Sequence, residues 1–374
     1  MSLKHSIDNS WLLRTTMIYL SNIIFFSIRF FKRNKKDLQR NIGVISLHKL
    51  GDTVFTIPAI KELIKQSNDS ITIICFKDSE KIYRYAFNNI NYLVLGEEDF
   101  YFSGRVATTK ARKLLQAILP DTILDLKGSI LSASLIFNIK CHKIYGINEI
   151  YFKKIYDRFQ KIRSTPHQID IYIDSVKTMF PNIVCNSYEY PIDFKKNGKI
   201  LIQPLAGWSA KEWGIFKFVQ LYHKLSQTNE CTFIFPGNSL KLDVIKQFDA
   251  ENINYISCDT IDHLITEISK CNLFISNDSG PLQIAALVGI PTFTIYGPTN
   301  PEFHLPYGKF HQFIQKRLKC SPSLEKYCAE NGGDSCPHHD CLELLSVDVV
   351  FKEIVKFVKV LEDHLFEFRG IGNV

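Results

Sequence analysis

The sequence lacks the long uncharged apolar runs that mark membrane-spanning helices. No such run in its 374 residues approaches the ~20 residues that a bilayer span requires, which excludes a protein that crosses the membrane many times. A cleavable leader with a small-residue cleavage site is also missing, so we expect a cytoplasmic protein. With 45% hydrophobic and 22% charged residues, the composition excludes disorder, a collagen-like repeat and a small disulfide scaffold. The length suggests about two or three domains.

Three common catalytic and nucleotide-binding motifs are missing as well. No G-x-G-x-x-G follows an apolar run, which disfavours a dinucleotide-dependent dehydrogenase. No G-x-x-x-x-G-K-[ST] is present, which disfavours P-loop chemistry. No G-x-S-x-G is present either, which disfavours a serine hydrolase of the nucleophile-elbow type.

The body of the chain lacks an excess of charge of either sign. The chain has 45 Lys and Arg residues, of which eight fall within residues 1–41, and 38 Asp and Glu residues, of which two fall there. The rest of the chain is therefore nearly neutral. A general nucleic-acid binder is therefore a poor interpretation, because such proteins carry a basic face.

The basic excess gathers in the tail, residues 1–41, which is also apolar and aromatic. Arg14 and Arg29 bracket 14 uncharged residues, and a basic cluster at 32–36 follows. This pattern favours a helix lying in the plane of an anionic membrane surface. A helix packed on the protein body and a short signal anchor are the alternatives.

Short apolar runs alternate with helical patterns from Ile42 onward. Such alternation predicts an α/β protein with parallel sheets covered by helices on both faces. The pattern occupies residues 42–192, pauses at a Lys-rich linker and restarts over 199–345, and residues 346–374 hold a last helix and a tail. The expected strands are 43–47, 71–75, 92–95, 122–126, 199–203, 231–235, 273–276 and, as the last, 292–296. Two doubly wound halves would face each other across a cleft at the carboxyl ends of their strands.

The first candidate site directly follows the first expected strand. Asp52 is expected in a loop that faces the cleft, where Gly51 permits a tight turn. A carboxylate there can act as a general base if burial raises its pKa or a well-placed hydroxyl meets it. Capping of a helix N-terminus is the structural alternative. We expect Pro58 at the first turn of the following helix, or at a kink.

Two loops of the second half carry groups suited to phosphate. Lys211 lies between a strand and a helix, where its charge adds to the positive end of the helix dipole, although a solvated lysine is an equal alternative. Residues 276–283 form a strand-turn-helix joint whose amides can bind a pyrophosphate, with Asp278 accepting bonds from sugar hydroxyls. Capping by Asn, Asp and Ser would explain much of the same pattern. The turn at 296–300 is expected at the same sheet edge.

Ten cysteines are present. Four of them share one short segment, spaced C-x7-C-x7-C-x4-C: Cys320, Cys328, Cys336 and Cys341. The close C-x2-C pairs of zinc ribbons are missing, so a loop of reduced thiols, a structural metal site and a disulfide all stay open. Three others lie in or beside apolar runs and are expected as buried thiols: Cys75, Cys231 and Cys271.

Together these motifs resemble glycosyltransferase family 9, the ADP-heptose:lipopolysaccharide heptosyltransferases. The resemblance spans about residues 42–358. The matching segments are Leu50-Gly51-Asp52-Thr53-Val54 with Pro58-Ala59, Asp125-Leu126-Lys127-Gly128, Ala210-Lys211-Glu212-Trp213, Asn277-Asp278-Ser279-Gly280-Pro281, Ala285-Ala286 and Gly297-Pro298-Thr299. One such motif is a weak signal, but four in the right order and context are specific. Gln203 stands where the family usually has His, and Lys49 where it often has Ser.

The resemblance implies a GT-B fold and inverting transfer of heptose from ADP-L-glycero-D-manno-heptose to a lipopolysaccharide inner-core acceptor, with no metal or other cofactor. It places the catalytic base at Asp52. It places the donor contacts at Lys211, Asp278, Ser279, Gly280, Pro281 and Thr299, and we expect the acceptor beside His48, Lys49 and Lys127. The partners would be the nucleotide sugar, a lipid-linked oligosaccharide and an anionic membrane surface, with no nucleic acid. The enzyme would be peripheral on the cytoplasmic face of the bacterial inner membrane.

Two other functions stay open at this point. One is heptose transfer to a protein hydroxyl, since relatives in the family modify autotransporters; those relatives use a four-Cys metal site, so bound metal would favour it. The other is a non-catalytic sugar-nucleotide-binding relative, which the altered donor loop at Gln203 suggests and the retained Asp52 and Lys211 oppose.

Overall fold

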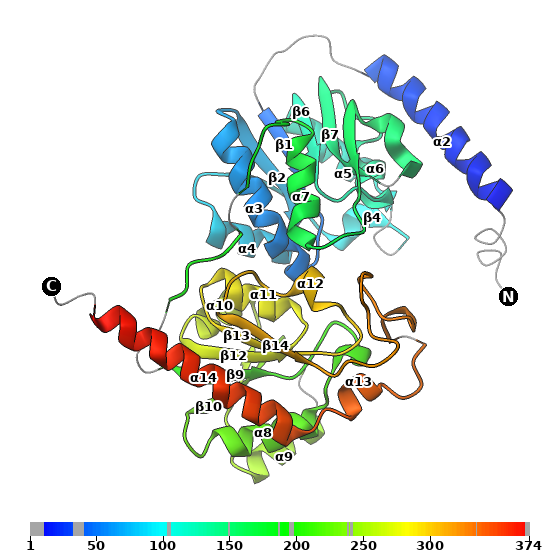
Figure 1. The fold of residues 1–374 in the computed structure, drawn as a ribbon. Coiled ribbons are helices and arrows are strands. Elements are labelled where there is room, and N and C mark those ends of the chain that lie inside the picture. The colour runs from blue at the N-terminus through cyan, green and yellow to red at the C-terminus, as the bar shows by residue number, and fades with distance from the viewer. Residues whose placement is uncertain are drawn as a thin grey trace. The chain divides into compact units, whose positions relative to one another are not determined.

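The computed structural model describes residues 11–32, 41–102, 106–148, 150–185, 188–193, 198–237, 239, 242–333 and 335–370. The chain divides into two compact units, one from residues 1–163 with 168–186 and the other from 164–167 with 187–374 (Figure 1). Most of the expected basic cluster, residues 33–36, and the centre of the expected linker, residues 194–197, lie outside the described residues.

The first unit is built on a parallel six-stranded sheet with the strand order β3-β2-β1-β6-β7-β8. Its strands are β1 (Asn41–Ile45), β2 (Ser70–Phe76), β3 (Asn91–Leu95), β6 (Thr122–Asp125), β7 (Lys143–Asn148) and β8 (Arg158–Lys161). Its helices are α2 (Trp11–Lys32), α3 (Leu50–Gln66), α4 (Lys77–Ala86), α5 (Thr109–Ala117), α6 (Ile130–Ile136) and α7 (Gln168–Lys177), with 3-10 turns η1 (Glu97–Asp99) and η2 (Ile150–Ile155). A short antiparallel pair, β4 (Phe100–Tyr101) and β5 (Val106–Ala107), is added.

The second unit repeats this plan, with a parallel sheet in the order β11-β10-β9-β12-β13-β14. Its strands are β9 (Lys199–Gln203), β10 (Cys231–Pro236), β11 (Tyr255–Cys258), β12 (Cys271–Asn277), β13 (Thr292–Tyr296) and β14 (His311–Gln315). Its helical segments are η3 (Ser209–Lys211), α8 (Ile215–Leu225), α9 (Leu242–Ala250), α10 (Ile261–Ile268), α11 (Gly280–Leu287), α12 (Pro301–His304), η4 (Asn331–Gly333), α13 (Asp340–Glu343) and α14 (Val347–Gly370).

Both sheets therefore have the strand order of doubly wound nucleotide-binding folds, and the expected α/β class is confirmed. In each sheet the first and fourth strands are neighbours, β1 with β6 and β9 with β12. The chain leaves these two strands in opposite directions, which opens a crevice at their carboxyl ends where ligands bind. The loops after these four strands are therefore where each unit can hold a ligand.

Helix α14 closes the core of the second unit. Its buried side chains recur at helical spacing, on one face: Val350, Ile354, Phe357 and Leu361. Trp213 belongs to the same core and its Nε1 donates to the backbone oxygen of Leu345 at 2.8 Å. Because Trp213 is fully buried, the loop that carries Lys211 two residues earlier is fixed in place.

The expected loop position of Asp52 is wrong, and so is the first of the two positions expected for Pro58, the first helical turn; its expected place at a kink stays a prediction. Asp52 does not lie in a loop: α3 begins at Leu50, with Lys49 as its N-cap, so Asp52 is in the first helical turn. Gly51 accordingly has no positive φ. Pro58 lies inside α3 rather than at its start, in a run of buried residues whose packing offsets the missing hydrogen bond.

Strand 292–296 is not the last strand, since β14 pairs with β13 in parallel. The strands β7, β8 and β11 were also not expected. The three cysteines expected as buried thiols are confirmed as such. Burial raises the pKa of Cys75 and of Cys231 to about 12. Within the described ranges, no helix combines the length and the apolar character needed to cross a membrane.

Candidate active site

Asp52 stands on a rigid first turn of α3. The turn is braced by Thr53, whose hydroxyl donates to the backbone oxygen of Lys49 at 2.9 Å and lies 2.9 Å from the Ser79 hydroxyl. Ser79 in turn donates to the backbone oxygen of His48 at 3.0 Å. Asp52 itself is half-buried, at the positive end of the helix dipole. The carboxylate is thus held in a fixed place without being closed off from solvent.

Lys127 is brought to Asp52 by the loop after β6. Burial lowers the pKa of Lys127, while the negative charges of Asp52 and Asp125 act to raise it. The loop is shaped by Asp125, whose Oδ1 accepts from the amides of Lys127 (2.8 Å) and Gly128 (3.2 Å). Gly128 has φ +60°, and a Cβ there would lie 2.5 Å from the backbone oxygen of Ile147. Only glycine therefore allows this turn.

The Asp125 carboxyl is itself buried and bonded. Tyr156 donates its hydroxyl to Asp125 Oδ2 at 2.6 Å. Burial raises the pKa of Asp125, and the bonds from Tyr156 and the two amides act against that rise. This carboxyl shapes the Lys127 loop and is not exposed to a substrate.

His48 is buried, with 3% of the residue exposed. Its Nδ1 lies 2.9 Å from the Ser46 hydroxyl, and its ring packs edge-on to Tyr172 with centroids 5.0 Å apart. Burial, and next the charge of Lys127, hold the pKa of His48 well below its ordinary value. The ring is therefore neutral at pH 7, and little of it can touch an acceptor.

Tyr172 is a neighbour of Asp52 that sequence reasoning missed. It comes from α7, which packs on α3, and its hydroxyl accepts from Gln168 Nε2 at 3.1 Å. Burial, and next the charge of Asp52, raise the pKa of Tyr172 well above its ordinary value. No local sequence signal could have paired these two residues, which are far apart in the chain.

In the second unit, Lys211, Asp278 and Thr299 converge at the carboxyl ends of three neighbouring strands. Lys211 Nζ lies 2.6 Å from Asp278 Oδ2, and the Thr299 hydroxyl donates to the same oxygen at 2.8 Å. The ion pair is buried, with 12% and 7% of the two side chains exposed. Burial alone would raise the pKa of Asp278, but the charges of Lys211 and His304 and the hydrogen bonds lower it on balance.

The Lys211 amine also contacts an aromatic ring, since it lies 4.1 Å from the centroid of the Trp208 ring. Trp208 packs edge-on to Tyr327 and its Nε1 donates to the backbone oxygen of Gly332 at 3.3 Å. The solvated lysine that the sequence allowed is therefore not what the structure shows.

The joint at the start of α11 is not closed by side-chain capping. Ser279 is the N-cap but makes no capping bond, because its hydroxyl donates to Gln203 Oε1 at 3.2 Å. Asn277 is used elsewhere, with Oδ1 accepting from the Trp213 amide (3.1 Å) and Nδ2 donating to the Pro204 oxygen (2.6 Å). The first amides of α11, which Gly280 and Pro281 begin, are thus left without a side-chain cap.

Tyr296 opens the turn at 296–300, which the sequence placed at this sheet edge without giving Tyr296 itself a role. It ends β13 and is fully buried. Burial, and next the charge of Asp278, raise its pKa well above the ordinary value. Within the described residues its hydroxyl has no hydrogen-bond partner.

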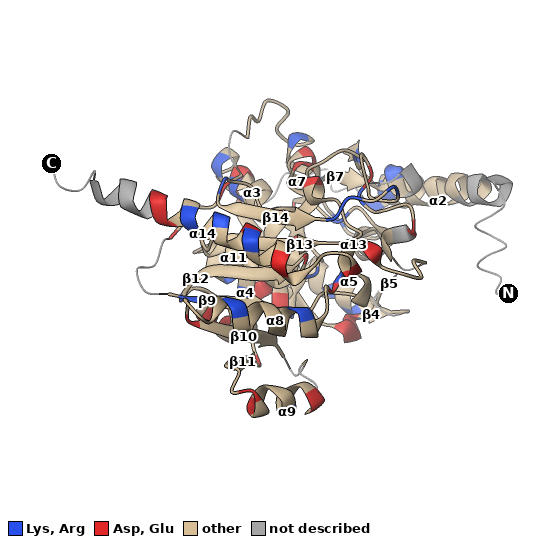
Figure 2. Ribbon diagram, turned by 60° about the horizontal axis from the view of Figure 1, so that its bottom comes forward, with Lys and Arg blue, Asp and Glu red and all other residues tan. Residues whose placement is uncertain are grey.

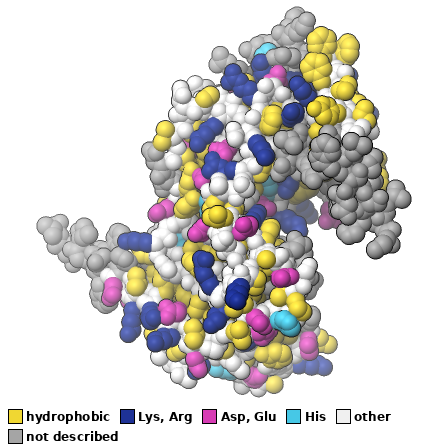
Figure 3. Space-filling model, turned by 45° about the vertical axis from the view of Figure 1, so that its right-hand side comes forward, with side chains coloured by type: hydrophobic (Ala, Val, Ile, Leu, Met, Phe, Trp, Pro, Cys, Tyr) yellow, Lys and Arg dark blue, Asp and Glu magenta, His cyan; other side chains and the backbone are white. Residues whose placement is uncertain are grey.

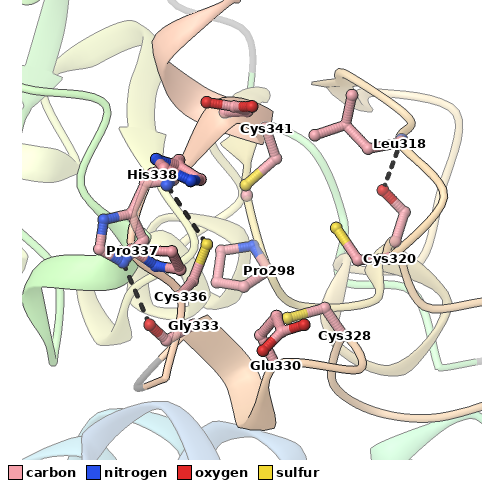
Figure 4. Close-up of a pocket in the computed structure, with 14 residues that line it drawn as sticks. Pro298, Leu318, Cys320, Cys328, Glu330, Gly333, Cys336, Pro337, His338 and Cys341 are labelled. Carbon is pink, nitrogen blue, oxygen red and sulfur yellow. Dashed lines mark hydrogen bonds between the residues drawn. The ribbon is translucent and has the colours of Figure 1, made fainter.

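The four clustered cysteines line one cavity of about 430 Å³. In Figure 4 the sulfur atoms of Cys320, Cys328, Cys336 and Cys341 point toward this space. All four are free thiols. Burial, and next the other three thiols, raise the pKa of Cys341 to about 11. Among the described residues no group of three His, Cys, Asp or Glu side chains is placed to hold a metal ion.

Comparison with known proteins gives this arrangement a context. Residues 168–333 match the family model of glycosyltransferase family 9 (heptosyltransferase). Lipooligosaccharide heptosyltransferase 2 of Campylobacter jejuni (strain 81116) is 29% identical over 178 residues, which cover 45% of this chain and 54% of the relative. The chain spans about half the length of the curated relatives it matches.

Solved structures share the fold over a longer range. A glycosyl transferase family 9 protein from Veillonella parvula has a TM-score of 0.68 at 18% identity, covering 87% of this chain and 98% of that one. The Escherichia coli heptosyltransferase WaaC with ADP-2-deoxy-2-fluoro heptose has a TM-score of 0.65 at 15% identity, covering 84% and 99%.

Proposed function

We propose that the chain is a glycosyltransferase of family 9, whose GT-B fold it shares, and that it transfers heptose from ADP-L-glycero-D-manno-heptose to a lipopolysaccharide inner-core acceptor. The observation that carries this proposal is the cluster of Lys211, Asp278 and Thr299 beside the uncapped start of α11. A fixed cation next to free helix amides is suited to a diphosphate.

The donor is proposed to lie with its diphosphate at the start of α11. The amides around Ser279 and Gly280 would bind phosphate oxygens, and Pro281, which has no amide hydrogen, presets the first turn of the helix. Lys211 would add a positive charge that stabilises the departing diphosphate. Since Lys211 is already paired with Asp278, its amine has to be shared between the carboxylate and the phosphate. Thr299 keeps Asp278 in place for that exchange.

The acceptor is proposed to bind the first unit through its cations. Lys49 is exposed and Lys127 is half-buried beside Asp52, so both can meet anionic groups of an inner-core saccharide. His48 is too buried for direct contact, and we assign it a positioning role through its packing on Tyr172.

Asp52 is proposed as the general base. The acceptor hydroxyl oxygen attacks the anomeric carbon, and its proton passes to the Asp52 carboxylate. The bond from that carbon to the diphosphate oxygen breaks, and ADP leaves with the electron pair. Attack opposite the leaving group inverts the configuration of the anomeric carbon. The residues that take part supply all of these steps, so no cofactor is invoked.

The test is transfer in solution with the purified full-length chain. ADP-heptose is incubated with a lipopolysaccharide acceptor truncated before its heptoses, and the product is analysed by mass spectrometry. We expect a mass gain of one heptose with release of ADP. Donor binding without transfer to any acceptor would support a non-catalytic relative instead.

The acceptor class is tested in parallel with a protein acceptor of the autotransporter type. A purified sample is also analysed for bound metal, since the four-thiol cavity lined by Cys320 and Cys341 is the place where the protein-modifying alternative would hold it. Transfer to the protein with stoichiometric metal would replace the lipopolysaccharide proposal. Because the lipopolysaccharide acceptor is lipid-linked, we also propose that the protein lies peripherally at the cytoplasmic face of the inner membrane.

A further inference from the structure

Helix α2 is fastened to the first unit by one face. Phe25 packs edge-on against Phe137 and Phe152, with ring centroids 6.0 and 5.7 Å away. Asn22, which is buried, accepts a hydrogen bond at its Oδ1 from the amide of Lys154 at 3.1 Å. These contacts set which side of the helix is turned inward.

Arg29 fixes the end of the helix. Its guanidinium donates to the backbone oxygens of Cys141 (3.0 Å) and His142 (2.9 Å) and pairs with Asp157 at 3.0 Å. The two charged side chains are largely buried, with 12% and 15% exposed. A bidentate, largely buried arginine of this kind resists rotation of the helix about its axis.

The opposite face of α2 is apolar and open. Each of its large side chains belongs to a residue that is 53% to 81% exposed: Tyr19, Leu20, Ile23, Ile24, Phe26, Phe30 and Phe31. Phe30 and Phe31 form an edge-on ring pair with centroids 5.6 Å apart. An exposed apolar patch of this size on a folded domain marks an interaction surface.

Cations border this apolar face. Lys32 lies in the last turn of α2, and Lys154 Nζ lies 5.8 Å from the centroid of the Phe26 ring. Lys153 beside it is exposed. The sequence from 11 to 32 contains no acidic residue, and Figure 2 shows none on the part of α2 that is not grey. Figure 3 shows hydrophobic side chains at the upper right with Lys and Arg side chains beside them.

We propose that the outer face of α2 inserts in the plane of an anionic lipid leaflet. Aromatic and aliphatic side chains enter the boundary between head groups and acyl chains, and the bordering lysines meet lipid phosphates. A water-exposed protein partner would need acidic groups opposite these lysines and would leave the aromatics to find pockets, whereas a leaflet satisfies both at once. This surface deepens the proposed function, because it would bring the first unit to a lipid-linked acceptor.

The test is flotation of the full-length chain with vesicles of phosphatidylcholine alone or with added phosphatidylglycerol. We expect the wild type to float with the anionic vesicles, and the double variant Phe30→Ser/Phe31→Ser to bind at least roughly tenfold less. The matched control is Tyr101→Ser/Phe102→Ser, which removes another edge-on pair from the same unit, 57% and 77% exposed. The control is expected to bind like the wild type. Wild-type protein that stays unbound, or equal binding by the α2 variant, would overturn the proposal.

A second copy of the chain is the main competing occupant of this face. Sedimentation of the wild type without lipid is expected to give a monomer with or without the α2 substitutions. A wild-type dimer that becomes a monomer in the Phe30→Ser/Phe31→Ser variant would show that a second copy of the chain covers this face, and it would overturn the lipid assignment.

Vesicle binding needs neither donor nor acceptor, so it can succeed where transfer fails. With a deacylated acceptor in solution, the α2 variant should transfer heptose at the wild-type rate, and with the acceptor in vesicles it should be slower. If the wild type uses neither acceptor, the proposed function fails and the flotation result still decides the lipid surface.

Discussion

Replacing Lys211 with methionine removes one partner of a buried ion pair while keeping most of the side-chain volume. The Asp278 carboxylate would then be left at a site where only 7% of the side chain is exposed, and its bond from Thr299 would remain. Breaking a buried pair in this way costs about 3–5 kcal/mol of unfolding free energy. The double variant Lys211→Met/Asp278→Asn should recover most of that loss, because it leaves no buried charge unpaired.

The unfolding of the second unit can be followed by tryptophan fluorescence in urea. Two of the three tryptophans, Trp208 and Trp213, belong to that unit, and Trp213 is fully buried in its core. A single variant within about 1 kcal/mol of the wild type would refute the buried pair, since loss of a solvent-exposed pair costs no more than that.

The same variant tests the donor site. Loss of a charge-assisted bond worth about 1.5–3 kcal/mol should weaken ADP-heptose binding roughly 10- to 150-fold. If the double variant regains stability but not donor affinity, the amine is needed for the donor itself. Donor affinity that is unchanged in both variants would remove Lys211 from the phosphate site.

Three further predictions concern single side chains. Asp52→Asn should lower kcat roughly 10²- to 10⁴-fold while calorimetry shows unchanged donor affinity, and wild-type turnover would exclude Asp52 as the base. Burial lowers the pKa of His311 from 6.5 to about 4. As the pH falls, the unfolded chain therefore binds a proton at this residue before the folded chain does. The stability that neutral His311 contributes above about pH 6.5 is lost progressively as the pH falls to about 4. At 1.36 kcal/mol per pH unit this loss is about 3 kcal/mol. His311→Asn should reduce the pH dependence of the unfolding free energy, measured by urea titration, by that amount, and an unaltered dependence would contradict the burial argument. Tyr296→Phe removes a buried hydroxyl that has no hydrogen-bond partner among the residues that the structure describes. The unfolding free energy should therefore stay equal or rise by about 1 kcal/mol, and a clear loss would show that the hydroxyl is bonded.

The central strands were predictable because both faces of a parallel sheet are covered. Strands such as β2 and β10 are mostly apolar runs, each with a buried threonine, and the sequence marks them clearly. The strand β8 (Arg158–Lys161) lies at a sheet edge and is mostly exposed, so three of its four residues are polar and it carries no such signal. The strand β14 is missed for the same reason, since it too is an edge strand and mostly exposed or half-buried.

The start of α3 shows a limit of local rules. Gly51 and Pro58 both predict a break, yet α3 runs from Leu50 to Gln66 through both positions. Every residue from Thr53 to Ile60 is buried, and this packing outweighs the local preferences. Local helix propensity does not predict how deeply a segment is buried in the fold.

The positions of the candidate site residues followed from strand ends, but their partners did not. Lys211 and Asp278 are 67 residues apart, and their contact depends on β9 and β12 being neighbours. Tyr172 lies in α7, a helix that the sequence analysis did not predict, and nothing in that segment indicates a nearby Asp52. Such long-range pairs require the fold.

The central claim is that the second unit binds an adenosine-diphosphate sugar through Lys211 and the start of α11. Calorimetry of the full-length chain against ADP-heptose and against uridine and guanosine diphosphate sugars tests it most directly. We predict saturable binding of ADP-heptose, weakened in Lys211→Met, and weaker or no binding of the other donors. Preference for another nucleotide sugar, or ADP-heptose binding that survives loss of the amine, would contradict the account.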